Sequence, residues 1–297
     1  MRAFFPSLLL LIITNARARD SRPALFRAGD APPSPSPSAD YSLLLPPTPP
    51  PRSQRSVLLG EFTGSFLLGL AVACAGASAV HTDLAPLAPL AVASILTGSI
   101  YAFGSVSGAV FNPAVSLALH LRGRISAADA ARFTAVQVLA MALAGVLGFL
   151  IYGVSAFPMV AEQSVAGYLS AGLAEVLFTF TIITVVLHLA TTKQHEHNDA
   201  AGLVLGLTIL GCAVCASKAS SACFNPAIAF GLYLGKALVE AARPAIASGP
   251  LGAALGAAAA EAPELEVSPW QPLLFTAGPM LGALLATRLF QATLPDE

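Results

Sequence analysis

Apolar residues are concentrated in six long runs that follow one another after Arg55, with polar or Gly/Pro-rich stretches between them. Most of these runs approach the roughly 20 residues that a helix needs to cross about 30 Å of hydrocarbon. We therefore predict an all-α membrane protein with six transmembrane helices. The predicted spans are Val57–Val80, Leu84–Phe103, Ala127–Tyr152, Val165–Ala190, Ala200–Ala216 and Trp270–Ala292.

Two further apolar segments are too short to span a membrane. Asn112–Leu121 lies between the second and third runs, and Asn225–Leu234 lies between the fifth and sixth. A ten-residue helix is about 15 Å long, which is half of the hydrocarbon core. Both segments begin with Asn-Pro-Ala, at Asn112-Pro113-Ala114 and Asn225-Pro226-Ala227. We predict two re-entrant half-helices that begin inside the membrane.

The chain also contains an internal repeat. Glu61 stands 51 positions before Asn112, and Glu175 stands 50 positions before Asn225. Three spans and one half-helix therefore occur twice, in repeat one (57–153) and repeat two (165–292) of a membrane domain at 57–292. An odd number of spans per repeat inverts the second copy in the membrane, and such inverted repeats place function at the midplane between interrupted helices.

Composition supports a bilayer as the solvent and excludes several classes of protein. Hydrophobic residues make up 56% of the chain and charged residues 10%, against about 25% charged in soluble domains. The net charge of −1 gives no basis for binding nucleic acid. The sequence shows neither a nucleophile–base pair nor a metal-ligand cluster, so we expect no enzyme, no catalytic residue, no metal and no cofactor.

The N-terminal region is expected to lie outside this membrane domain. Residues 1–18 carry Arg2, the apolar run Ala3–Ile13 and Ala16-Arg17-Ala18, a pattern typical of a cleaved signal peptide. Residues 19–56 are rich in Pro and Ser, which predicts a disordered leader or tail. If this leader is processed, we expect an intracellular or plastid membrane, and otherwise the plasma membrane.

An Asn-Pro-Ala start suits a pore. Asn is a favoured N-cap, because its side-chain carbonyl accepts from a free N–H of the first turn. Pro has no N–H to lose there, and Ala lets two such turns touch. Each half-helix carries about half a positive charge at its N-terminus. Two facing N-termini would disfavour cations and protons while neutral molecules pass.

With these motifs the chain resembles the aquaporin (major intrinsic protein) family over about residues 57–292. The resemblance implies six tilted helices, two half-helices that meet at the centre, one pore per subunit, and a homotetramer in a lipid bilayer. In the family, glutamates at Glu61 and Glu175 brace the loops that carry the half-helices, and Gln137 on the third span also matches. The other matching residues are Ser107-Gly108-Ala109-Val110-Phe111-Asn112-Pro113-Ala114-Val115, Cys223-Phe224-Asn225-Pro226-Ala227 and Gly278-Pro279.

The sequence departs from the family at the selectivity filter. Most members have Arg directly after the second Asn-Pro-Ala, and this chain has Ile228, followed by Ala229 where glycerol channels have Asp. By family spacing the four filter positions are Val92, Ala213, Ala222 and Ile228. Such an apolar filter of small side chains should be wide. We expect water and small neutral solutes such as glycerol, urea, ammonia or peroxide to permeate, and a hydrophobic constriction can also gate by dewetting.

Two remaining segments leave alternatives open. Lys218, seven residues before Asn225, either reaches the vestibule or extends to the aqueous interface. The insertion at 237–267 is interrupted by Pro244, Pro250 and Pro263, which favours a surface loop or a short interfacial helix.

Two other functions stay open at this point. A secondary transporter shares inverted repeats and broken helices, although it usually needs ionisable or sodium-coordinating groups at the midplane. A non-conducting structural or adhesion homologue would also be compatible with the altered filter, since hydrophobic constrictions can close.

Overall fold

The computed structural model describes residues 52–81, 83, 85–160, 162–195, 198–249, 268 and 270–295, all within the compact unit that begins at Pro51. The predicted signal peptide, the leader up to residue 51 and residues 250–267 of the predicted insertion lie outside the described residues. Short 3-10 turns occupy Ala85–Leu87 and Lys193–His195. The α-helices are α2 (Gln54–His81), α3 (Ala88–Ser107), α4 (Pro113–Leu121), α5 (Ala127–Tyr152), α6 (Val165–Thr191), α7 (Ala201–Ala216), α8 (Pro226–Ser248) and α11 (Trp270–Thr293).

Each of the six predicted spans is a helix with ends within a few residues of the prediction. The largest shift is in α3, which begins at Ala88 and ends at Ser107, four residues later than predicted at each end. Helix α2 begins at Gln54, inside the predicted leader. Among the described residues, five helices are long and apolar enough to cross a membrane, while α7 is a shorter apolar helix of 16 residues. At 1.5 Å per residue α7 is about 24 Å long, so it nearly matches the hydrocarbon thickness.

The second half-helix differs from its prediction. The sequence predicted a ten-residue helix that ends at Leu234, but α8 has 23 residues and ends at Ser248. Residues 237–248, expected in a surface loop or interfacial helix, therefore continue the half-helix. The physical reason is packing against α5: a Cβ at Gly235 would lie only 2.8 Å from the carbonyl oxygen of Ala142. Further along, Val239 is buried beside Phe149.

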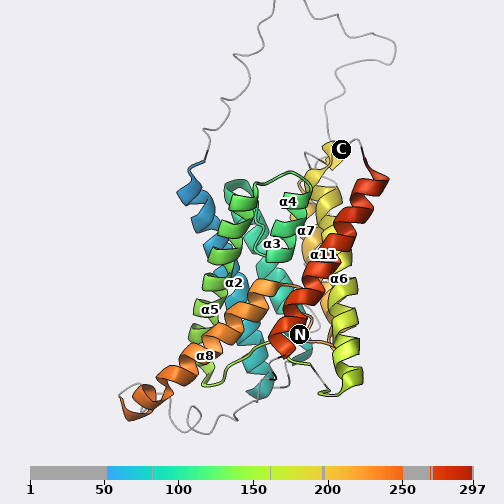
Figure 1. Ribbon diagram of the computed structural model, residues 1–297. Coiled ribbons are helices and arrows are strands. Elements are labelled where there is room, and N and C mark those ends of the chain that lie inside the picture. The colour runs from blue at the N-terminus through green and yellow to red at the C-terminus, as the bar shows by residue number, and fades with distance from the viewer. Residues whose placement is uncertain are drawn as a thin grey trace, which may run out of the picture. The chain divides into compact units, whose positions relative to one another are not determined.

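The contacts between helices repeat with the sequence (Figure 1). In the first half α2 packs on α3 and α5, and in the second half α6 packs on α7 and α11. Each half-helix packs on the last span of the other half, so that α8 lies along α5 and α4 lies along α11. The halves are also joined by α3 and α7. The inverted repeat predicted from the sequence thus corresponds to two matching helix groups that exchange their half-helices.

Small residues allow these helices to approach closely. A Cβ added to Gly148 on α5 would lie 2.7 Å from the Cβ of Ala73 on α2. On α11, a Cβ added to Gly278 would lie 2.8 Å from the Cβ of Glu175 on α6. Lipid chains are as apolar as helix surfaces, so close packing of small residues is a main source of helix association in membranes.

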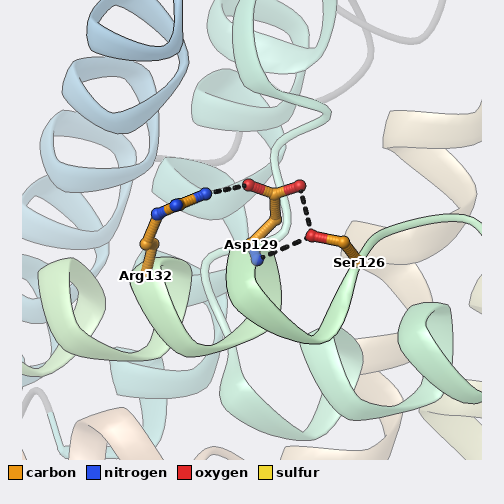
Figure 2. A network of polar contacts seen from close by, with 3 residues as sticks. All are labelled: Ser126, Asp129 and Arg132. Atoms are coloured by element: carbon orange, nitrogen blue, oxygen red, sulfur yellow. Dashed lines mark hydrogen bonds and ion pairs between the residues drawn. The ribbon is translucent and has the colours of Figure 1, made fainter.

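A capped first turn fixes the start of α5 directly after the first half-helix (Figure 2). The Ser126 hydroxyl accepts from the Asp129 N–H at 3.0 Å and donates to the Asp129 carboxylate at 2.7 Å. That carboxylate also pairs with Arg132 at 2.9 Å. An acidic group in the first turn interacts favourably with the helix dipole. About three turns further along, α5 carries Gln137 towards the centre of the bundle.

Candidate functional site

Both Asn-Pro-Ala motifs form capped helix N-termini. Asn112 and Asn225 have extended backbone conformations, and prolines occupy the first turns of α4 and α8. The Oδ1 of Asn112 accepts from the N–H of Ala114 at 2.9 Å, and the Oδ1 of Asn225 accepts from the N–H of Ala227 at 2.9 Å. These are the capping bonds that the motif predicts.

The two asparagine amides also connect the halves of the chain. Nδ2 of Asn112 donates to the carbonyl oxygen of Phe224 at 3.0 Å, and Nδ2 of Asn225 donates to that of Phe111 at 3.0 Å. A side-chain amide has two N–H donors. One of the two N–H groups of each amide is therefore used to join the loops.

A buried glutamate holds the loop before each half-helix. Glu61 and Glu175 are fully buried. The Glu61 carboxylate accepts from the hydroxyl of Ser107 (2.7 Å) and from the N–H groups of Val110 (3.0 Å) and Phe111 (2.9 Å). The Glu175 carboxylate accepts from the equivalent groups, which are Ser220 (2.8 Å), Cys223 (3.0 Å) and Phe224 (2.7 Å). These bonds offset the desolvation of each carboxylate.

The same loops hold non-glycine residues in the left-handed region. Ala109 and Phe111 have φ of 52° and 49°, and Ala222 and Phe224 have φ of 52° and 50°. Such conformations cost about 1–3 kcal/mol each and persist only where the surroundings fix them. Here they turn successive N–H groups towards the glutamates. The strain and the carboxylate are therefore parts of one arrangement, present twice.

The two halves differ beside the glutamates. Nε2 of Gln137 donates to Glu61 at 2.9 Å, which gives that carboxylate a fourth donor. In the second half Gly278 of α11 instead packs directly against the Cβ of Glu175. Gln137, which the family resemblance singles out on the third span, thus lies on α5 in contact with Glu61 and is not among the residues that line the cavity described below.

One cavity of about 540 Å³ connects these features. Asn112 and Asn225 both line it. Its wall extends from Pro89, near the start of α3, to Ala190, near the end of α6. Within the described part of the chain, no charged residue and no histidine lines this cavity. The four predicted filter positions all line it: Val92, Ala213, Ala222 and Ile228.

Sequence reasoning missed one contributor to this cavity. Ala156, Phe157 and Pro158, from the connection between α5 and α6, also line it. The four-position filter transferred from the family contains no aromatic residue, whereas Phe157 places one on the cavity wall. The available indication was an aromatic–proline pair in the short connection between two spans. Lys218, by contrast, is exposed and is not among the lining residues.

Comparison with known proteins agrees with this geometry. The family model described as Major intrinsic protein matches residues 52–290, which is most of the chain. The chain belongs to the major intrinsic protein family. It is therefore a multi-pass integral membrane protein, of a family of channels for water and glycerol-type solutes rather than of enzymes.

Several curated members of the major intrinsic protein family are similar in sequence. The glycerol uptake facilitator protein-like 6 of Lactiplantibacillus plantarum is 34% identical over 58% of this chain and 81% of its own length. Aquaporin NIP1-4 of Oryza sativa subsp. japonica is 31% identical over 68% of this chain and 73% of its own. Aquaporin AqpM of Methanothermobacter thermautotrophicus is 29% identical over 49% of this chain and 61% of its own.

The fold has a solved counterpart. The aquaglyceroporin from Plasmodium falciparum superposes with a TM-score of 0.64, covering 82% of this chain and 97% of that chain at 17% identity. This likeness confirms the predicted all-helical major intrinsic protein fold.

Proposed function

We propose that this chain is a passive channel for water and small neutral solutes, among them glycerol, urea, ammonia and peroxide. The observation that carries the proposal is the single cavity of about 540 Å³, lined by both Asn-Pro-Ala asparagines and by all four filter positions. Val92, Ala213, Ala222 and Ile228 act as a wide apolar filter, and the asparagine pair forms the barrier to ions at the midplane.

The midplane chemistry favours neutral permeants. The N-termini of α4 and α8 meet there, since each asparagine bonds to the loop of the other half. Each N-terminus contributes about half a positive charge, which repels cations and protons. The remaining N–H of each asparagine can donate to the oxygen of a passing water or hydroxyl. That combination transmits neutral polar molecules one after another.

The filter favours loose selection. Ile228 is almost fully buried, packs with other apolar residues and provides neither a charge nor a hydrogen-bond donor. A solute with apolar C–H groups loses less free energy on entering this filter than on entering a ring of hydrogen-bond donors. The name of the Lactiplantibacillus plantarum relative, a glycerol uptake facilitator protein-like protein, supports glycerol as one permeant. Water has fewer partners in such a filter, so its flux is expected to be modest.

The buried polar residues act behind the pore wall. Glu61, Glu175 and Gln137 are fully buried, and none of them is among the residues that line the cavity. Their bonds end on the loops at 107–111 and 220–224. We infer that they set the position of the asparagines and do not touch the permeant.

The test uses purified protein in proteoliposomes and a panel of neutral solutes, with empty liposomes as the control. Glycerol and urea should equilibrate faster than in the control, at a rate that does not depend on proton or sodium gradients. Flux that requires an ion gradient would favour a secondary transporter. Flux equal to that of empty liposomes, for every solute and for water, would favour a non-conducting structural or adhesion homologue.

We further propose that four copies assemble into a homotetramer. The outer face of α6 exposes Leu169, Leu173 and Leu177, spaced one turn apart, and α7 exposes Leu203 and Leu207. In a membrane such faces meet lipid or another copy. Light scattering of the detergent-solubilised protein, corrected for detergent, should give four chains per particle, and a stable monomer would contradict the assembly.

The membrane in which the channel works depends on the N-terminal segment. If residues 1–18 are cleaved as a signal peptide, we propose an intracellular or plastid membrane, and otherwise the plasma membrane. N-terminal sequencing of the mature protein decides between these. An intact residue 1 or 2 would contradict processing.

A further inference from the structure

The segment Ala156–Val160, here called the strap, crosses the bundle beside the cavity. At one end Ala156 packs on α2. A Cβ added to Gly76 of α2 would lie 2.8 Å from the Cβ of Ala156. The carbonyl oxygen of Pro158 accepts a hydrogen bond from the hydroxyl of Tyr233 on α8. At the other end Val160 pairs with Ser220 in an antiparallel bridge.

The strap is joined to the loop that carries a filter residue. The Ser221 hydroxyl accepts from the N–H of Met159 at 2.8 Å and donates to the Met159 carbonyl at 2.8 Å. Ser221 directly precedes the filter residue Ala222. The hydroxyl uses its proton and one acceptor lone pair on the strap. Ser221 therefore acts mainly as an anchor for the strap, although it lines the cavity.

Phe157 is the large apolar side chain that the strap brings to the cavity. It is 9% exposed and lines the same cavity as the four filter residues. It also belongs to the same buried cluster as Ile228 and Leu232. Val92 packs against this cluster as well, so the ring lies on the same side of the cavity as Val92 and Ile228.

Two residues of α8, one of them beyond the predicted end of the half-helix, contact this ring. The ring of Tyr233 lies 5.3 Å from the ring of Phe157, measured between centroids. The Nζ of Lys236 lies 5.5 Å from the centroid of the Phe157 ring, within the range of a cation–π contact. Lys236 is in turn paired with Glu240, one turn further along α8. A half-helix that ended at Leu234 would carry neither Lys236 nor Glu240.

We propose that Phe157 is a fifth filter side chain, which sets the size limit of the pore, and that Lys236 is a positioning residue for its ring. This inference rests on the proposed function and deepens it. The four aliphatic positions of the proposed filter include no aromatic ring, and Phe157 adds one to the same cavity wall. With Phe157 in place, the pore selects by size against an apolar aromatic wall and not by hydrogen-bond donors.

The experiment compares polyols of increasing length in proteoliposomes. Glycerol, erythritol and ribitol present the same chemistry at three, four and five carbons. The Phe157→Leu channel should admit ribitol, raising the ribitol-to-glycerol ratio of rates by about tenfold. Phe149→Leu is the matched control, because Phe149 is also buried but does not line the cavity. It should leave the ratio unchanged.

A second pair of variants tests the positioning role. Lys236→Met removes the cation beside the ring and should raise the ribitol-to-glycerol ratio by less than Phe157→Leu does. Lys236→Arg keeps the cation and should keep the wild-type ratio. Each variant is first checked for a single symmetric peak in size-exclusion chromatography.

The outcomes separate this inference from the proposed function. A wild-type protein with no flux of any neutral solute contradicts both. Normal glycerol flux together with unchanged ribitol exclusion in Phe157→Leu contradicts the fifth filter position alone. An unchanged ratio in Lys236→Met, with the expected change in Phe157→Leu, contradicts the positioning role.

Discussion

Asn112 and Asn225 connect the two halves of the chain reciprocally, each donating a side-chain N–H to the main-chain carbonyl next to the other. The carbonyls belong to Phe224 and Phe111, the residues that directly precede the two motifs. Each asparagine therefore caps its own helix and fixes the loop of the other half. The two loops at the centre are thus joined by a reciprocal pair of hydrogen bonds, so a shift of one loop would disturb the other.

Asn225→Asp removes the hydrogen bond of Asn225 to the other half while keeping its helix cap. The Asp carboxylate still accepts from the N–H of Ala227, but it has no N–H for the carbonyl of Phe111 and adds a negative charge at the midplane. We expect a lower melting temperature and a proton or potassium leak that wild type lacks. The leak is measured with a potential-sensitive dye in proteoliposomes. A variant as tight to ions as wild type would show that the asparagine pair is not the ion barrier.

Glu175→Gln tests the loop brace. The amide replaces a charged acceptor of three hydrogen bonds and directs its own N–H₂ at donor groups. Bonds to a charged group contribute about 1.5–3 kcal/mol each, so we expect a loss on the order of 3 kcal/mol, seen as a clear fall in melting temperature. Glu240→Gln is the control, since its partly exposed ion pair should contribute less than about 1 kcal/mol. Equal small losses in both variants would contradict the bracing role.

Gly282→Ala tests the close packing of α6 and α11. The new Cβ would lie 2.4 Å from the carbonyl oxygen of Val176 and 2.9 Å from the N of Phe180, and both are main-chain atoms. We expect a destabilisation of about 1–3 kcal/mol despite the better helix propensity of Ala. Gly172→Ala on α6 is the control, because its nearest contact, a side-chain atom of Leu274, is at 3.8 Å. It should be neutral or stabilising in a thermal melt, and the reverse order of the two variants would contradict the packing.

Lys218→Ala should leave transport unchanged. Lys218 is exposed and does not line the cavity, so we expect that its charge does not replace the arginine that the family resemblance predicts at position 228. Proton leak and glycerol flux are measured in the same proteoliposomes as for wild type. An increase in proton leak would contradict this and would assign the lysine a role in the vestibule.

Sequence periodicity and motif chemistry predicted most of the architecture. Transmembrane helices have long apolar runs because the bilayer requires them, and the Asn-Pro cap follows from backbone donors that need partners. The length of α8 was not predictable in this way. Its added turns are stabilised by packing on α5 through Gly235 and Val239, which is a tertiary effect.

The candidate site was predicted where it is local in the chain or transferable from the family. The asparagines, the glutamates and Ile228 are placed by their spacing from the motifs. Phe157 was missed, because it reaches the cavity from an irregular connection whose position depends on Tyr233, Ser220 and Ser221. These partners are 60 or more positions away in the sequence.

Ile228 carries the central claim, and stopped-flow swelling of proteoliposomes in water and glycerol gradients tests it most directly. The wild-type channel should conduct glycerol, with water flux that is modest beside it. Ile228→Arg should restore a charge and donors at the filter and lower the ratio of glycerol to water flux by about tenfold, while Ile228→Leu should resemble wild type. Strictly water-only flux through the wild-type protein would contradict the account.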